Sequence, residues 1–195
     1  MNFMFDRLRS PLILSAGRSG SMLLAHDIGQ FTKCDLVTVS ADHRGFLKSH
    51  CSMTPVHSHW LHSADDLARY TCFFSLRKNP VDTIMSWVCA DHYNIHHLWS
   101  NEQNKLFESF TVTDWRRIDW FIQQHVAWCN HYTPMLLPEH QIVFYEDYVL
   151  GLPLDVAYRP TFPNKERLLT NYQQVADYIS RSKEIMLTAQ SPFQK

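Results

Sequence analysis

The stretch that decides the fold is "PLILSAGRSGSMLLAHDI", residues 11–28. It opens with a short apolar run, passes two glycines on either side of Arg18, and continues with Leu23, Leu24 and Ile28 at helical spacing. This order predicts a buried strand, a glycine turn and a helix. A turn that opens a helix presents unpaired backbone N–H groups and the positive end of the helix dipole, which suit a phosphate or sulfate. The sequence therefore predicts an anion site beside Arg18. A glycine needed only for the geometry of the turn is the alternative.

A second turn of this kind follows "TCFFSL", residues 71–76, which is typical of a strand buried on both faces of a parallel sheet. The turn holds Arg77 and Lys78, and an Asn-Pro pair then marks the start of a helix. Ser86 lies about two helical turns after Lys78, so its hydroxyl is expected on the same side of the helix. Basic side chains and a hydroxyl that converge on one anion are the functional interpretation. An exposed basic pair and a buried helix serine are the alternative.

Strands and helices alternate along the chain. We expect a three-layer α/β/α fold with a central parallel sheet, formed as a single domain over residues 1–195. In such sheets ligands bind at the carboxyl ends of the strands, where both turns fall. Besides the segments above, we expect strands at 35–39, 54–60 and 141–148, a short helix at 65–70, a long amphipathic helix at 113–132 with Trp120 facing the core, and a closing helix at 170–181.

Composition excludes several classes of partner. The 195 residues include 18 basic and 19 acidic ones, so no bulk charge favours nucleic acid or a membrane surface. Five scattered cysteines without a C-x-x-C pair predict neither a disulfide framework nor a zinc knuckle. His92 and His96 are four residues apart but lack further ligands at metal-binding spacing. The apolar run after the charged start is too short for a signal peptide or a membrane span, so we expect a cytoplasmic protein.

Together the two turns resemble the nucleotide-binding motifs of the cytosolic-type sulfotransferase family. "SAGRSGSMLL" resembles that family's 5′-phosphosulfate loop, and "LRKNPVDTIMSW" resembles its 3′-phosphate motif. "QIVFYEDY" resembles a family strand that ends in Tyr-Glu-Asp, and "WFIQQHVAWCNHY" resembles the helix before it. The matching order and spacing cover roughly residues 10–150. The chain is shorter than typical members.

The resemblance implies a P-loop-like α/β fold and 3′-phosphoadenosine 5′-phosphosulfate as the donor, with 3′,5′-adenosine bisphosphate as the product and no required metal. It implies that Arg18 stabilises the leaving phosphate. The acceptor stays open among small molecules, carbohydrates and peptides, as does the oligomeric state. The residues that the resemblance assigns to the donor are Gly17, Arg18, Ser19, Gly20, Ser21, Met22, Arg77, Lys78 and Ser86. It adds Lys165 and Arg167 from the C-terminal segment. The alternative for these last two is an exposed, solvated pair.

Three positions depart from the family pattern. Gly17 stands where proline is usual, and Met22 replaces a second hydroxyl residue, which removes one donor to the phosphate. Lys78 stands where arginine is usual and lacks its bidentate fork. Because Arg77 lies one residue earlier, both are candidate ligands of the 3′-phosphate.

The family often uses a histidine as general base, in a Lys-Thr-His setting on the strand before the 3′-phosphate strand. "PVHSHW" occupies that place, so His59 is the candidate base and His57 stands where lysine is common. Asp42 is a rival, and His62 is a weaker candidate.

Two other functions remain open from the sequence. One is a P-loop-like kinase that uses ATP, although the turn lacks the lysine of G-x-x-x-x-G-K-[ST]. The other is a catalytically inactive relative that binds a nucleotide or a protein partner.

Overall fold

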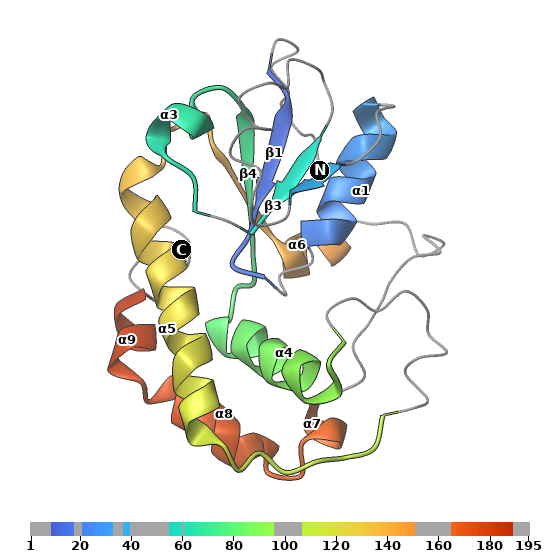
Figure 1. Cartoon of the computed structure of the whole chain (residues 1–195), viewed down its shortest axis with the longest axis vertical. Coiled ribbons are helices and arrows are strands. Elements are labelled where there is room, and N and C mark those ends of the chain that lie inside the picture. The colour runs from blue at the N-terminus through green and yellow to red at the C-terminus, as the bar shows by residue number, and fades with distance from the viewer. Residues whose placement is uncertain are drawn as a thin grey trace. The chain divides into compact units, whose positions relative to one another are not determined.

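The computed structural model describes residues 9–17, 21–32, 37–39, 55–59, 61–95, 107–150 and 165–188 (Figure 1). Its strands are β1 (Pro11–Leu14), β2 (Val37–Val39), β3 (Val56–Ser58), β4 (Thr71–Leu76) and β5 (Gln141–Phe144). Its helices are α1 (Ser21–Thr32), α3 (Ala64–Leu67), α4 (Pro80–Tyr93), α5 (Trp115–Tyr132), the 3₁₀ turn η2 (Thr133–Met135), α6 (Tyr145–Leu150), α7 (Lys165–Leu168), α8 (Tyr172–Ser180) and α9 (Lys183–Thr188). None of these helices combines the length and the apolar character needed to cross a membrane.

The five strands form one sheet in the order β2-β3-β1-β4-β5. Every neighbouring pair is parallel: Leu14 of β1 lies opposite Ser58 of β3 on one side and opposite Phe74 of β4 on the other. The predicted α/β class and the parallel sheet are confirmed. Strand β1 is therefore the central strand of the sheet.

Strands β1 and β4 are buried along their whole length. Strands buried on both faces need apolar residues at every position rather than at alternate ones, which explains the continuous runs "PLIL" and "TCFF". Helix α1 packs against β1, β3 and β4, and its Leu24 and Ile28 are at most 1% exposed. The central strands are thus covered by helices and neighbouring strands up to the loops at their carboxyl ends.

The chain divides into two compact units. The first contains residues 1–78 and 131–152, and therefore the whole sheet; the second contains residues 79–130 and 153–195. The core of the second unit is apolar and comes from α4, α5, α7, α8 and α9, with Ile84, Ile122 and Val175 among its fully buried side chains. The single domain expected from the sequence stays a prediction.

Helix α5 follows the predicted amphipathic pattern except at Trp120. Ile118 and Ile122 are buried, whereas Trp120 is 44% exposed, so its predicted core position is wrong. A residue two positions from each isoleucine lies on nearly the opposite side of a helix. The Arg117 guanidinium covers the exposed indole at 4.6 Å from the ring centroid.

Two other expectations are corrected near the C-terminus. The strand expected over 141–148 ends at Phe144, and "YEDYVL" forms α6 instead. The expected closing helix corresponds to α8, but α9 follows it and α7 precedes it. The irregular crossing chain expected over 152–163 lies outside the described residues.

Asn79 caps α4, and its removal gives a measurable prediction. Its side-chain Oδ1 accepts a hydrogen bond from the Val81 backbone N–H at 3.0 Å, with Pro80 as the first helical residue. We expect Asn79→Ala to lower the free energy of unfolding by about 1 kcal/mol, because one N–H of the first turn loses its acceptor. Urea unfolding measures the change. Asn79→Asp keeps an acceptor and should retain most of the stability; an equal loss in both variants contradicts the capping role.

Candidate functional site

The carboxyl ends of β3, β1 and β4 lie side by side in the sheet. The chain leaves β1 toward β2 on one side and leaves β4 toward β5 on the other, so the strand order diverges between β1 and β4. Ligands of open parallel sheets bind at such a divergence, beyond the carboxyl ends of the strands. The two turns predicted to bind anions begin at these two strand ends, after Leu14 and after Leu76.

The first turn contains a glycine, Gly17, in a conformation that few other residues adopt. Gly17 has a φ of 90°, and its N–H donates to the Ser15 hydroxyl at 3.3 Å. Proline has a fixed φ near −65°, so it does not fit this conformation. The structure thus gives a backbone reason for glycine where the family pattern has proline. Arg18, Ser19 and Gly20 lie outside the described residues.

Ser21 is the first residue of α1 and is 3% exposed. Its hydroxyl contacts two side chains of the first unit: it accepts from Ser15 Oγ at 2.9 Å and lies 2.8 Å from His57 Nε2. Met22, the next residue of α1 and also a predicted donor ligand, is half-buried. The Ser21 side chain is therefore engaged within the protein, which the sequence did not indicate.

His59 follows directly after β3 and is exposed. Its Nδ1 lies 2.9 Å from Ser15 Oγ and 3.2 Å from the Ser15 carbonyl oxygen, so the candidate base contacts the end of β1. His57 is fully buried, and its ring meets that of His59 edge to face at 4.5 Å. The weaker candidate His62 is buried, with Nε2 at 2.8 Å from Ser58 Oγ. The rival Asp42 lies outside the described residues.

At the end of β4, Arg77 and Lys78 face acidic groups of α6. Lys78 pairs with Asp147 at 2.5 Å, and its backbone N–H donates to Glu146 at 2.9 Å. Arg77 lies 3.9 Å from Glu146 and stacks over the Tyr145 ring at 4.5 Å. These two cations and two carboxylates carry no net charge together. A phosphate bound here competes with the carboxylates of Glu146 and Asp147 for the two cations. The contact between these carboxylates and the basic pair was not predicted from the sequence, although two acidic residues after an expected strand were a usable signal.

The remaining predicted ligands belong to the second unit. Ser86 is buried in α4 with 1% exposure. Lys165 donates to the Asp82 backbone carbonyl at 3.0 Å and lies 3.7 Å from its carboxylate. Arg167 is exposed on α7. The placement of these three residues relative to the glycine turn stays a prediction.

No group of three or more metal-ligating side chains occurs in the described part of the chain. His92, one of the two histidines considered for a metal, stacks instead on the Phe110 ring at 3.7 Å. His96, the second of these two histidines, lies outside the described residues.

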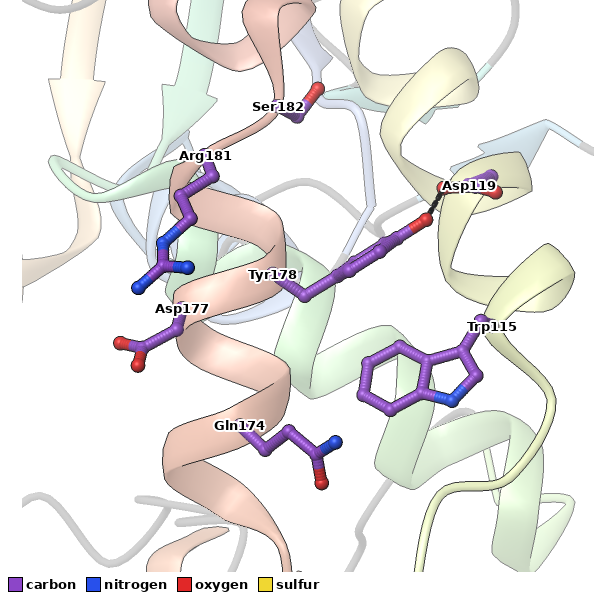
Figure 2. Close-up of a pocket in the computed structure, with 7 residues that line it drawn as sticks. All are labelled: Trp115, Asp119, Gln174, Asp177, Tyr178, Arg181 and Ser182. Carbon is purple, nitrogen blue, oxygen red and sulfur yellow. Dashed lines mark hydrogen bonds between the residues drawn. The ribbon is translucent and has the colours of Figure 1, made fainter.

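A pocket of about 660 Å³ lies on the second unit between α5 and α8 (Figure 2). Tyr178 points across it and donates to Asp119 at 2.7 Å, and this hydrogen bond raises the pKa of the Tyr178 phenol. The Trp115 ring lies 4.9 Å from that of Tyr178. Gln174, Asp177, Arg181 and Ser182 complete the lining. The pocket contains none of the residues predicted to bind the donor.

No protein-family model, curated protein or solved structure matches this chain.

Proposed function

We propose that the chain is a sulfotransferase that moves a sulfuryl group from 3′-phosphoadenosine 5′-phosphosulfate to an acceptor hydroxyl or amine. The observation that carries the proposal is the strand order. It makes neighbours of three strands whose carboxyl ends lead into His59, the glycine turn, and the Arg77–Lys78 pair. A candidate base and two candidate anion sites thus follow three adjacent strands.

In the proposed reaction, the acceptor oxygen forms a bond to sulfur while the bond between sulfur and the bridging phosphate oxygen breaks. The electron pair of that bond stays on the leaving 5′-phosphate of 3′,5′-adenosine bisphosphate, and the acceptor proton passes to the His59 imidazole. Transfer of this kind depends on in-line positioning and charge stabilisation more than on covalent chemistry. Arg18 is proposed to neutralise the charge that develops on the leaving phosphate.

The two ends of the donor require two anion sites. The glycine turn suits the phosphosulfate, because a residue with φ near 90° and no Cβ lets the ligand approach the backbone at Gly17. The Arg77–Lys78 pair suits the 3′-phosphate. Its cations are already held by Glu146 and Asp147, which orient them but also oppose an incoming anion.

Thermal unfolding with two nucleotides tests the proposal. We expect 3′,5′-adenosine bisphosphate at about 100 times its Kd to raise the melting temperature by several degrees, because it binds the folded state. ATP with Mg²⁺ should produce no comparable shift. Stabilisation by ATP and not by the bisphosphate overturns the proposal in favour of a kinase or ATP-binding protein.

A nucleotide pair and one variant locate the 3′-phosphate. 5′-AMP lacks this phosphate, so it should stabilise the wild-type protein less than the bisphosphate does. In Arg77→Ala/Lys78→Ala the two nucleotides should stabilise equally, whereas Arg116→Ala, a change at an exposed arginine of α5, should preserve the difference. If the bisphosphate still stabilises the double variant more than 5′-AMP does, Arg77 and Lys78 do not bind the 3′-phosphate.

A further inference from the structure

We propose that Ser15 is a positioning residue that holds the neutral His59 imidazole in its Nδ1–H tautomer, so that Nε2 carries the lone pair that accepts the acceptor proton. The role of Nε2 rests on the sulfotransferase proposal. The tautomer itself follows from contacts in the first unit and can be measured without any activity.

The Ser15 carbonyl determines which nitrogen of His59 carries hydrogen. His59 Nδ1 lies 3.2 Å from this carbonyl oxygen and 2.9 Å from Ser15 Oγ. A carbonyl oxygen only accepts hydrogen bonds, so a lone pair on Nδ1 would repel it. A hydrogen on Nδ1 is instead shared between the two Ser15 oxygens. Because neutral imidazole has one N–H, Nε2 is then the unprotonated nitrogen.

The hydrogen bond between the Ser15 and Ser21 hydroxyls leads to the same tautomer of His59 by a separate argument. Ser15 Oγ donates its single hydrogen to Ser21 Oγ at 2.9 Å, so it has none left for His59 and must accept from Nδ1. Ser21 Oγ also lies 2.8 Å from His57 Nε2, and either atom of that pair can donate. The direction that bears on His59 therefore runs from its Nδ1–H through Ser15 to Ser21.

Burial makes this direction costly to reverse. Ser15 and His57 are 0% exposed and Ser21 is 3% exposed, so water does not replace a lost bond. Reversal requires both hydroxyls to turn and places the Nδ1 lone pair against the Ser15 carbonyl. Once His59 has taken the acceptor proton, its Nδ1–H still donates to both Ser15 oxygens, which also stabilises the imidazolium.

Nitrogen-15 NMR of the full-length protein with labelled histidine tests the inference. We expect wild-type His59, assigned through His59→Gln, to show a protonated Nδ1 and an unprotonated Nε2 at a pH where the ring is neutral. An Nε2-protonated His59 in the wild-type protein overturns the inference, whatever the activity; the tautomer is read from the wild-type protein, and the variant serves only to assign its resonances.

Two serine variants give matched comparisons. Ser15→Ala removes the hydroxyl and should move part of the His59 population to the Nε2–H tautomer. Ser58→Ala removes an equally buried hydroxyl from the neighbouring strand, where it contacts His62 Nε2, and should leave His59 unchanged. If the His59 tautomer is unchanged in Ser15→Ala, the Ser15 hydroxyl does not position the imidazole.

The kinetic readout separates this inference from the proposed function. With a ³⁵S-labelled donor, kcat of Ser15→Ala should fall by the same fraction as its Nδ1–H population. A loss of tautomer with no loss of kcat overturns the role of Nε2. If the wild-type protein shows the expected tautomer but transfers no sulfuryl group to any acceptor, the proposed function fails while the assignment of the hydrogen-bonded chain stands.

Discussion

Replacing Arg18 with alanine is expected to lower the rate of sulfuryl transfer at saturating donor by about 100-fold or more, as removal of one preorganised donor at a developing oxyanion does elsewhere. In the proposed reaction, negative charge grows on the leaving phosphate as the bridging bond breaks. A guanidinium next to that phosphate interacts more strongly with its charge in the transition state than in the ground state, so its loss reduces kcat. The measurement is transfer from ³⁵S-labelled donor to a panel of phenol, sugar and tyrosyl-peptide acceptors.

Two further variants show whether the effect belongs to this guanidinium. Arg18→Lys keeps the charge but loses the planar fork, so its rate should lie between those of the wild type and Arg18→Ala. Arg116→Ala removes an exposed arginine from α5 and should leave the rate unchanged. Transfer by Arg18→Ala at the wild-type rate contradicts the role proposed for Arg18, and unaltered melting temperatures confirm that the comparison is between folded proteins.

The elements with strong local signals were predictable from the sequence. "TCFFSL" forms β4 over the predicted residues, and α4 begins at Pro80 after the Asn79 cap. Both signals are written in consecutive residues: an apolar run typical of a strand covered on both faces, and a side-chain oxygen that accepts from the first helical turn.

The end of β5 was not predictable in this way. "QIVFYEDY" has the aromatic and β-branched residues of a strand, but the chain turns into α6 at Tyr145. Glu146 and Asp147 lie in the first turn of this helix, where its dipole favours acidic residues. There they contact Arg77 and Lys78 from nearly 70 residues away in the sequence. Only the order of strands brings these groups together, and no local pattern encodes that order.

The residues that contact the candidate base His59 could not be predicted either, because they also depend on how the strands pair. The sequence identified His59 by the resemblance of "PVHSHW" to the family's base-bearing strand, but its partner Ser15 is 44 residues away. Their contact requires β1 and β3 to pair in parallel with Leu14 opposite Ser58. Once this register is known, Ser15 and His59 each follow directly after paired residues. The register thus supplies the contact that residue type and spacing could not.

Acidification should destabilise the protein through His125, a buried residue of α5 in the second unit. Burial lowers the pKa of His125 to about 4, from an ordinary value near 6.5. Its Nε2 lies 3.7 Å from Cys129 Sγ, and its Nδ1 has no hydrogen-bond partner among the described residues. The folded protein therefore holds this imidazole neutral at a pH where the unfolded chain protonates it.

The sign of the effect follows from proton binding. Between pH 6.5 and pH 4 the unfolded state binds more protons at His125 than the folded state, so stability falls as the pH falls through this range. The full shift corresponds to about 3 kcal/mol between pH 7 and pH 4. Replacing His125 with leucine, which does not titrate, should reduce the loss of unfolding free energy over this range by about that amount.

Urea unfolding of the wild type and His125→Leu at pH 7 and pH 4 measures this difference, and it cancels the contribution of carboxylates common to both proteins. Gln124→Leu changes an exposed residue of the same helix that does not titrate, and should retain the wild-type loss. At neutral pH, His125→Leu should cost little, because it replaces a ring whose buried Nδ1 has no hydrogen-bond partner among the described residues with an apolar group of similar size. If His125→Leu loses as much stability on acidification as the wild type, the folded protein accepts a proton at His125 as readily as the unfolded chain does. Burial then does not lower the pKa of this imidazole.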